Sequence, residues 1–361
     1  MKFLFASELP HLPQKFGGVQ SSTHELAQEL KQNGHQAVIA AGLFPSDRIG
    51  LQTRALAKII PKRKVYDRVL GYPTYRRWIV RDALVDIVAE TRPDVAVVQP
   101  LRQVSLAEEL ERLSVPTVVY IRDVEWNLLG GDPRNLENSV FVSNSRFTAK
   151  SLMERYAIPS TVIIPLFRSA EYQAPRRPEN VTFINPHPLK GLGLALEIVS
   201  RCPDIPFCFV KSWELNEEEE DAVTRGSRAY GNLTVLPPTR DIAAVYSRAK
   251  IVLMPSKWEE AWGRVATEAQ FTGIPVIASD RGGLPDAVGP GGLLLDDSIE
   301  SWVHAVRKLW FDHTYYSELS AAALAHSMRQ DLDPAVQVEA LLSVARKAIR
   351  ARAAEQVAGR A

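Results

Sequence analysis

Residues 250–289 read KIVLMPSKWEEAWGRVATEAQFTGIPVIASDRGGLPDAVG, and they contain the clearest indication of secondary structure in the sequence. An apolar, β-branched run ends at Pro255 and Ser256, and a second such run, GIPVIAS, occupies 273–279. The residues between the two runs are typical of a loop followed by a helix that begins near Gly263. Strand, helix and strand in this order predict a βαβ unit whose two strands lie parallel in one sheet.

Similar apolar runs alternate with helical patterns along most of the chain. In the first half they occupy residues 2–7, 36–42, 94–99, 117–121 and 139–143. In the second half they occupy residues 181–185, 206–211, 232–237, 250–256, 273–279 and 291–295. The alternation indicates an α/β protein with two consecutive parallel sheets and a cleft between them. Because ligands bind outside the carboxyl ends of strands in such sheets, we expect the functional residues in strand-to-helix loops.

The length of 361 residues, with 46% hydrophobic residues, agrees with two domains that each carry a core. We predict a first domain over residues 1–166 and a linker over 167–180, which is rich in Pro and Arg. A second domain follows over 181–330. The remaining residues, 331–361, are predicted to form a C-terminal helix that returns to the first domain.

Charge and cysteine content exclude several classes of protein. The chain has 43 Lys and Arg residues against 42 Asp and Glu residues, a net charge of +1, so nucleic acid is not an expected partner. Cys202 and Cys208 lie in one apolar stretch, which favours buried reduced thiols over a disulfide or metal site. No apolar run approaches the roughly 18 residues of a membrane span, and Glu8 interrupts the first run too early for a signal peptide. We expect a cytoplasmic protein.

Segment 54–81 is the most basic part of the chain. Its nine basic residues are Arg54, Lys58, Lys62, Arg63, Lys64, Arg68, Arg76, Arg77 and Arg81. Four aromatic residues are interleaved with them, namely Tyr66, Tyr72, Tyr75 and Trp78. This composition suits contact with anionic lipid headgroups on the inner face of a membrane, or with a lipid-phosphate acceptor. A solvated charged face is the simpler alternative.

Two acidic residues flank the helix that begins near Gly263. Glu260 lies in the loop before it and Glu268 in its early turns. Gly263 allows a ligand to approach the free N–H groups at the helix start, where the dipole favours a pyrophosphate. The carboxylates would repel phosphate but accept hydrogen bonds from vicinal hydroxyls, one on a ribose and one on a sugar. Simple helix-dipole partners are the alternative interpretation.

A pair of glycines, Gly17 and Gly18, follows the first strand and precedes a helix expected near 22–32. Backbone N–H groups there can hold a phosphate or a sugar, although a plain tight turn is the alternative. The full G-x-G-x-x-G fingerprint is absent, and the second strand is not followed by the acidic residue that binds an adenosine ribose. A dehydrogenase is therefore disfavoured.

The seven histidines are scattered singly, without the spacing of metal ligands, so we expect no metal site and no metal cofactor. The triplet Asp331-Leu332-Asp333 precedes Pro334 and is typical of a helix N-terminal cap. There is no P-loop and no G-x-S-x-G motif, which excludes simple kinase and serine-hydrolase interpretations.

The same motifs resemble the signature of the retaining glycosyltransferases of family 4. The family's E-x7-E motif falls on Glu260 and Glu268, and GIPVIASDRGGLPD matches its G-x-P-V-I-A-S and G-G-x-P-E stretches, with Asp286 in place of Glu. Further matches are FGGVQ at 16–20, FVSNSRFTAK at 141–150 and LKG at 189–191. The resemblance extends from the first residue to about residue 330 in ordered motifs, which makes the combination specific.

The resemblance implies a GT-B fold, in which two Rossmann-like domains face a central cleft and enclose a nucleotide-sugar. It assigns the ribose hydroxyls to Glu268, a donor-sugar hydroxyl to Glu260 and the diphosphate leaving group to Lys190. By the same resemblance, Gly17 and Gly18 face the donor phosphate or the acceptor. The backbone from Trp262 through Gly263 to Arg264 would line the sugar.

Two departures from the family pattern stand out. Asn185 aligns with a position where many members carry an arginine, and Arg264 and Arg240 are the candidates to supply that charge. Arg122 and Asp123 stand where members often carry a histidine. Asp123 could bind a sugar hydroxyl or accept the acceptor's proton, with Arg122 as its partner, and a structural ion pair is the simpler alternative.

The sequence thus predicts a retaining hexosyltransferase that uses a nucleoside-diphosphate sugar and a saccharide or lipid-linked glycan acceptor. Surface polysaccharide or glycolipid biosynthesis is the expected setting. Two alternatives stay open: a nucleotide-sugar epimerase or phosphorylase of the same fold, and a non-catalytic nucleotide-sugar-binding protein.

Overall fold

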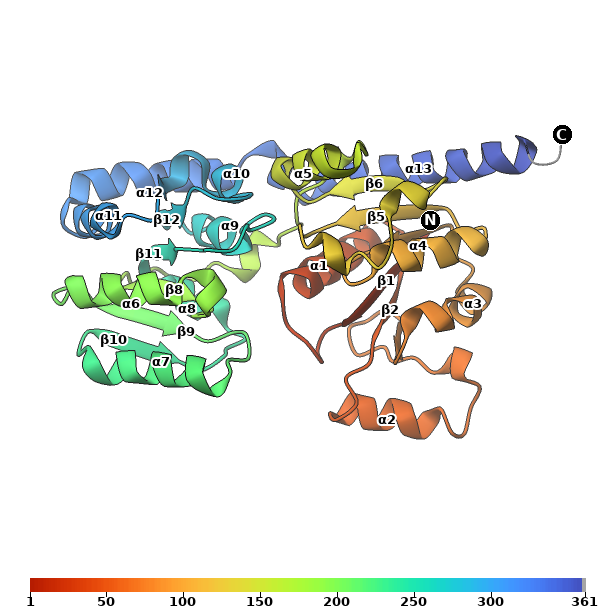
Figure 1. The fold of residues 1–361 in the computed structure, drawn as a ribbon, viewed down its shortest axis with the longest axis horizontal. Helices are drawn as coiled ribbons and strands as arrows, with labels where there is room; N and C mark the ends of the chain where they lie inside the picture. Colours follow the sequence, from red (N-terminus) through yellow and green to blue (C-terminus); the bar gives the residue numbers. More distant parts are fainter. Residues whose placement is uncertain (359–361) are drawn as a thin grey trace. The chain divides into compact units, whose positions relative to one another are not determined.

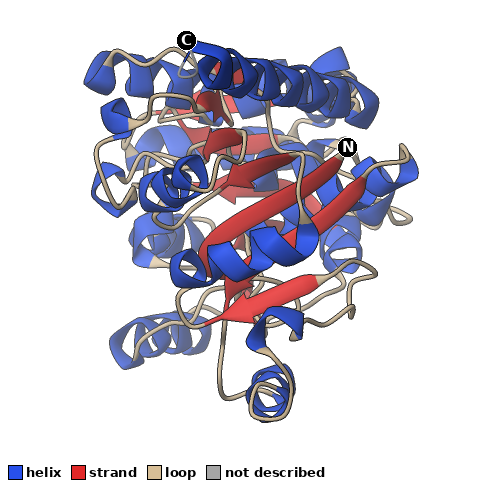
Figure 2. Cartoon of the chain, turned by 90° about the vertical axis from the view of Figure 1, so that its right-hand side faces the viewer, coloured by secondary structure: helices blue, strands red, loops and turns tan. Residues whose placement is uncertain are grey.

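The computed structural model describes residues 1–358, which divide into two compact units. The N-terminal unit holds Met1–Leu166 and the residues from Asp333 onward, and the C-terminal unit holds Phe167–Leu332. Residues 359–361, the end of the helix expected over 331–361, lie outside the described residues. Each unit is an α/β layer structure with helices on both sides of a parallel sheet (Figures 1 and 2).

The N-terminal unit is built on a seven-stranded parallel sheet with the order β3-β2-β1-β4-β5-β6-β7. Its strands are β1 (Lys2–Pro10), β2 (Gln36–Gly42), β3 (Thr74–Arg77), β4 (Val95–Val98), β5 (Thr117–Ile121), β6 (Val140–Ser143) and β7 (Thr161–Val162). Its helices are α1 (Gly18–Gln32), α2 (Arg48–Leu56), α3 (Val80–Thr91), α4 (Gln103–Arg112), α5 (Arg146–Tyr156) and α13 (Pro334–Ala358). The apolar core on one face of the sheet includes side chains of α1 and α13, and the core on the other face includes those of α3, α4 and α5.

The C-terminal helix α13 belongs to the N-terminal unit, where it contacts β4, β5 and β6 (Figure 1). Its buried apolar side chains, among them Leu341 and Ala345, share the core of α1. Asp333 caps its first turn, because the Asp333 carboxylate accepts a hydrogen bond from the backbone N–H of Ala335 at 2.8 Å.

The C-terminal unit is built on a six-stranded parallel sheet with the order β10-β9-β8-β11-β12-β13. Its strands are β8 (Asn180–Ile184), β9 (Phe207–Val210), β10 (Leu233–Leu236), β11 (Ala249–Met254), β12 (Val276–Ser279) and β13 (Gly292–Leu295). Its helices are α6 (Leu192–Arg201), α7 (Glu217–Ala229), α8 (Ile242–Arg248), α9 (Arg264–Gln270), α10 (Leu284–Val288), α11 (Ile299–Phe311) and α12 (His313–Ser327). The predicted fold class, two Rossmann-like α/β sheets with helices at the C-terminus, is confirmed.

Both sheets are doubly wound, so each has a point where the strand order reverses. In the N-terminal unit this point lies between β1 and β4, and in the C-terminal unit it lies between β8 and β11. The loops that follow these strand pairs diverge there and leave space for a ligand. Gln99, Asn185 and Ser256 lie just after the ends of β4, β8 and β11, and Ser7 lies in the last half of β1.

Two of the differences between the structure and the expected elements concern α1 and β3 of the N-terminal unit. Helix α1 begins at Gly18 and not near residue 22, because the backbone N–H of Ser21 already donates to Gly17 O at 2.9 Å. Strand β3 was not expected, since its sequence is charged. Its Arg76 side chain is fully buried, and Asp67 and the carbonyl oxygens of His11 and Leu12 accept its hydrogen bonds. These partners offset the desolvation of the guanidinium.

Segment 54–81 does not form one uniform surface. Tyr72, Tyr75 and Arg76 are buried in the N-terminal unit, so the expectation that they face a membrane is wrong for these three side chains. Ile59 is 80% exposed and Trp78 is 64% exposed. Among the described residues, no helix combines the length and the apolar character needed to cross a membrane.

Candidate functional site

The loops that follow β8 and β11 meet at the reversal point of the C-terminal sheet. Leu189 O, in the short 3-10 turn Pro188–Lys190, accepts hydrogen bonds from the backbone N–H groups of Lys257 and Trp258, both at 3.0 Å. Gly191 follows with a φ of 89°, and a Cβ placed there would lie 1.8 Å from Pro255 O. Only glycine therefore lets the two loops approach this closely.

This approach brings Lys190 and Glu260 together, 70 residues apart in the sequence. Lys190 Nζ lies 2.7 Å from Glu260 Oε1, and both side chains are 14% exposed. Ser256 Oγ donates to the same carboxylate oxygen at 2.8 Å. Among the side chains that the structure describes, both donors to this carboxylate contact Oε1, and none contacts Oε2. The Glu260 carboxylate is thus held in one orientation, with its second oxygen available to a ligand hydroxyl.

A pair of glycines positions the backbone of Glu260 from the other side. Gly282 has a φ of 60°, and a Cβ there would lie 2.6 Å from Glu260 O. The backbone N–H of Gly283 donates to the same oxygen at 2.6 Å. The motif GGLPD in the loop after β12 therefore acts as a support for the acidic loop.

Glu268 lies in the second turn of α9 and has two donors. Arg264 Nε donates to Oε1 at 3.1 Å, and Tyr246 Oη donates to Oε2 at 2.8 Å. Helix α9 begins at Arg264, with Gly263 as its N-cap at a φ of 99°. The predicted helix start and the place of Glu268 on it agree with the structure, whereas Tyr246 was not singled out from the sequence.

The surroundings of Lys190 include residues that sequence reasoning missed. The Trp213 ring centroid lies 4.9 Å from Lys190 Nζ, and this tryptophan is 42% exposed. The backbone N–H of Trp213 donates to Asn185 Oδ1 at 3.1 Å, and Asn185 itself has a φ of 64°. Asn185 thus shapes the turn after β8. Nothing in the sequence singles out Trp213, because its contact with Lys190 depends on how two loops fold against each other.

Three other residues that the sequence predicts for the site are Trp262, Arg264 and Arg240. Trp262 is buried, and its Nε1 donates to Thr267 Oγ1 at 3.0 Å, so the ring packs inside the unit. Arg264 is committed to Glu268 and to Tyr172, whose hydroxyl accepts from Nη2 at 2.8 Å. Arg240 lies on the exposed loop that follows β10, the edge strand of the sheet.

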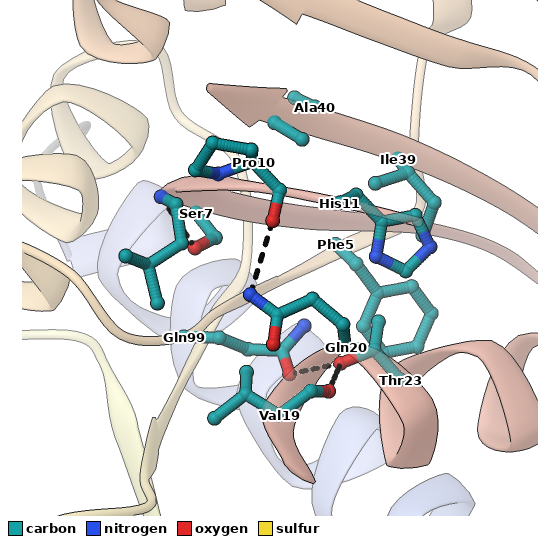
Figure 3. Close-up of a pocket in the computed structure, with 12 residues that line it drawn as sticks. Phe5, Ser7, Pro10, His11, Val19, Gln20, Thr23, Ile39, Ala40 and Gln99 are labelled. Atoms are coloured by element: carbon teal, nitrogen blue, oxygen red, sulfur yellow. Dashed lines mark hydrogen bonds between the residues drawn. The ribbon is translucent and has the colours of Figure 1, made fainter. Parts of the chain in front are cut away.

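The N-terminal unit has a pocket at its own reversal point (Figure 3). Gln20 Nε2 donates to Pro10 O at 3.0 Å, and Thr23 Oγ1 donates to Gln99 Oε1 at 2.7 Å. The polar lining residues are Ser7, His11, Gln20, Thr23 and Gln99. Gly17 and Gly18 immediately precede Val19 and Gln20 of this lining, so the predicted glycine pair borders the pocket.

Arg122 and Asp123 follow β5 in the same unit. The buried Arg122 guanidinium donates to Ser22 Oγ at 2.7 Å on α1 and lies 4.1 Å from the Tyr120 ring centroid. It therefore anchors α1 to the sheet. Burial, together with the charge of Glu125, raises the pKa of Asp123 to about 6.

Gly191→Ala tests the close approach of the two loops. The variant is expected to lower the free energy of unfolding by at least about 1–3 kcal/mol, because alanine is strained at this φ and its Cβ would overlap Pro255 O. Gly193→Ala is the matched control, since nothing lies within 4 Å of its Cβ position in α6. Urea unfolding of both variants checks this, and equal effects would contradict the proposed constraint.

Asp123→Asn tests the raised pKa. The folded pKa of about 6 lies above the ordinary value of 3.8, so ionisation of Asp123 lowers stability as the pH rises through this window. The variant is expected to gain about 1–3 kcal/mol of stability relative to wild type at pH 7.5 compared with pH 3.5. In the control Asp132→Asn the sign is reversed, because Arg134 lowers the pKa of Asp132 to about 2. Urea titrations at both pH values provide the measurement, and a pH-independent difference for Asp123→Asn would refute the assignment.

Two family profiles match the chain in sequence order, one on each unit. The family described as Glycosyltransferase Family 4 matches residues 16–168, and Glycosyl transferases group 1 matches residues 188–325. The second match contains Lys190, Glu260 and Glu268.

Curated relatives and solved structures agree with these matches. A D-inositol 3-phosphate glycosyltransferase of Rhodococcus erythropolis is 32% identical over 222 residues, which cover 53% of this chain and 50% of that relative. A relative of the same description from Segniliparus rotundus is 27% identical over 301 residues, covering 76% of this chain and 64% of its own length. The chain thus spans about half to two thirds of these relatives.

Among solved structures, HepE of Anabaena in complex with UDP-glucose is similar with a TM-score of 0.75 and 17% identity. The likeness covers 95% of this chain and 99% of HepE. At this identity the likeness concerns the fold. Because the two profiles follow each other on two Rossmann-like units of the GT-B type, the chain belongs to the glycosyltransferases of family 4.

Proposed function

We propose that the protein is a retaining glycosyltransferase that moves a hexose-type sugar from a nucleoside-diphosphate sugar to a saccharide or lipid-linked glycan acceptor. The observation that carries the proposal is the contact between Lys190 and Glu260 at the reversal point between β8 and β11, with Glu268 on the following helix. A cation and two oriented carboxylates at one edge of a sheet suit a ligand that has both phosphates and hydroxyls.

The names of similar proteins support the donor class. HepE is in complex with UDP-glucose in its crystal structure, and the curated relatives are described as D-inositol 3-phosphate glycosyltransferases. For this chain, Glu268 is assigned to the ribose hydroxyls and Glu260 to a hydroxyl of the donor sugar.

Lys190 is assigned to the diphosphate leaving group. When the bond between the sugar carbon and the phosphate oxygen breaks, the electron pair leaves with that oxygen, and a fixed ammonium stabilises the charge that develops. Glu260 neutralises Lys190 before the donor binds, since the two side chains are 2.7 Å apart. This assignment supplies the positive charge from the protein, and we propose a reaction that needs no metal ion.

We propose that the acceptor binds to the N-terminal unit at the pocket bordered by Gly17 and Gly18. The lining side chains Gln20 and Gln99 offer amide groups that suit hydroxyls (Figure 3). Asp123, with a pKa raised to about 6, is assigned to the acceptor hydroxyl, and its carboxylate takes the hydroxyl proton as the new glycosidic bond forms. Surface polysaccharide or glycolipid biosynthesis is the setting that we propose for this reaction.

We propose a second contact, between segment 54–81 and an anionic membrane surface at the inner face of the membrane. Helix α2 stands away from the sheet of its unit (Figure 1). Exposed apolar side chains accompany it and the residues that follow, namely Leu51, Leu56, Ile59, Val69, Trp78 and Ile79. The exposed basic residues Arg54, Lys58, Lys62, Lys64, Arg68 and Arg81 are interleaved with them along the chain. Apolar side chains mixed with cations match the chemistry of an anionic lipid headgroup region.

The proposed activity is tested with a panel of nucleotides, two variants of the site and two control variants. UDP, GDP, ADP and their sugars are screened by thermal unfolding, where one nucleotide is expected to raise the melting temperature. Turnover with that donor, measured against saccharide, lipid-linked and polyol-phosphate acceptors, is expected to fall at least about 100-fold in Lys190→Ala and Glu260→Ala. The exposed neighbours Lys257 and Glu259, changed to alanine, serve as controls with near wild-type turnover.

The outcomes separate the alternatives. Turnover that persists in a chelator supports the metal-free assignment. Conversion of the nucleotide-sugar without an acceptor would indicate an epimerase, transfer to inorganic phosphate a phosphorylase, and binding without turnover a non-catalytic protein. Unchanged turnover in Lys190→Ala would overturn the assignment of the leaving-group cation.

The membrane contact is tested by sedimentation with phosphatidylglycerol and phosphatidylcholine vesicles. Arg54→Gln combined with Lys58→Gln is expected to weaken partitioning to phosphatidylglycerol by about 30-fold, at about 1 kcal/mol per basic residue. Arg225→Gln combined with Arg228→Gln, on the exposed face of α7, is the matched control and should bind as wild type does. Binding to both lipids alike, or an equal loss in the control, would refute this surface.

A further inference from the structure

Tyr246 is a fully buried polar side chain that the proposed reaction does not use. It lies on α8, one turn before β11, and its hydroxyl donates to Glu268 Oε2 at 2.8 Å. Burial and the neighbouring Glu268 carboxylate raise the pKa of Tyr246 well above its ordinary value of 10. The phenol therefore keeps its proton and remains a donor at neutral pH.

Arg264 holds the other oxygen of the same carboxylate. Its Nε donates to Glu268 Oε1 at 3.1 Å, and the two side chains are only 11% and 12% exposed. The guanidinium is fixed in turn by Tyr172, whose hydroxyl accepts from Nη2 at 2.8 Å, and by the Phe167 ring, whose centroid lies 4.2 Å away. The planar fork of the arginine is thus held in one orientation before it meets the carboxylate.

The aromatic side chains around this group form one packed cluster within the C-terminal unit. Phe271 stacks on Tyr172 with centroids 6.0 Å apart, and Tyr172 meets Tyr246 edge-on at 6.5 Å. Phe271 also contacts Phe167 at 5.8 Å. Each donor to Glu268 is therefore supported by neighbours that restrict its rotamers.

Among the described residues, Tyr246 and Arg264 are the donors to this carboxylate, and they leave half of its acceptor directions unused. Each carboxylate oxygen offers two acceptor directions, and Tyr246 and Arg264 occupy one direction on each oxygen. The two remaining directions lie on adjacent oxygens of one fixed plane. That arrangement matches two neighbouring hydroxyls of a vicinal diol better than a single hydroxyl or a phosphate.

We propose that Tyr246 and Arg264 are positioning residues that fix the plane of the Glu268 carboxylate for the 2′- and 3′-hydroxyls of the donor nucleotide. The proposal rests on the role assigned to Glu268 under the proposed function. It adds that the discrimination between a ribose with both hydroxyls and a sugar without them depends on two side chains whose donor groups contact Glu268. A side chain that positions another acts through geometry, so its loss should affect only ligands that use the positioned group.

The experiment compares ligands with and without the diol. Calorimetric titrations of wild type use UDP, GDP and ADP, each beside its 2′,3′-dideoxy counterpart, and the pair with the tightest diphosphate is carried forward. Tyr246→Phe is expected to bind the ribonucleotide about tenfold more weakly than wild type, because it removes one hydrogen bond to a charged group. Its affinity for the dideoxy nucleotide is expected to stay within twofold of wild type.

Two further variants make the comparison decisive. Arg264→Gln removes the charged donor by a different route and is expected to show the same loss confined to the ribonucleotide. Tyr316→Phe is the matched control, since its hydroxyl accepts from Arg176 Nη2 at 3.1 Å elsewhere in the unit. It should bind both ligands as wild type does. Thermal unfolding of all three variants establishes that they are folded.

Each outcome bears on a different statement. Equal losses for both ligands in Tyr246→Phe and Arg264→Gln would show a general structural effect, and no loss for either ligand would show that the donors are dispensable. Both results overturn the positioning role while nucleotide binding stands. If wild type binds none of the diphosphates, the proposed function itself fails. If it binds the dideoxy form equally well, the role of Glu268 fails and the inference with it.

Discussion

The geometry of the candidate site depends on how closely two loops approach at the carboxyl edge of the second sheet. Leu189 O accepts two backbone hydrogen bonds from the loop after β11, and Gly191 leaves room for the Pro255 carbonyl. The contact between Lys190 and Glu260 follows from this backbone arrangement. Glycines, which carry no chemistry of their own, therefore decide where the charged groups stand.

The charged groups of the site are paired with each other in the structure. Lys190 faces Glu260, and Arg264 faces Glu268, each pair within 3.1 Å and mostly shielded from solvent. An unpaired charge is costly in such partly buried surroundings. In both pairs, each charged side chain has a partner of opposite charge. In the proposed reaction, a diphosphate becomes the partner of Lys190, and sugar hydroxyls use the acceptor directions that the carboxylates retain.

The basic residues of segment 54–81 divide into two groups with different physical roles. Arg76 is fully buried, and its hydrogen bonds to the carbonyl oxygens of His11 and Leu12 tie β3 to the loop that leads into α1. The exposed members, such as Arg54 and Lys58 on and after α2, lie beside exposed apolar side chains. Basic residues that are close in the sequence thus include a buried arginine, which stabilises the unit, and exposed residues on its surface.

The two parallel sheets are predictable from the amino-acid sequence, because buried parallel strands appear as continuous apolar runs, as at 36–42 and 117–121. Resemblance to the motifs of family 4 also singled out Lys190, Glu260 and Glu268. Only the tertiary structure decided their partners: Ser256 and Lys190 for Glu260, and Tyr246 and Arg264 for Glu268. It also placed the charged strand β3 inside, where Asp67 and carbonyl oxygens satisfy Arg76. The reason is physical: propensity and periodicity act over a few residues, whereas the neighbour of a side chain is set by strand order and by the close contacts between loops.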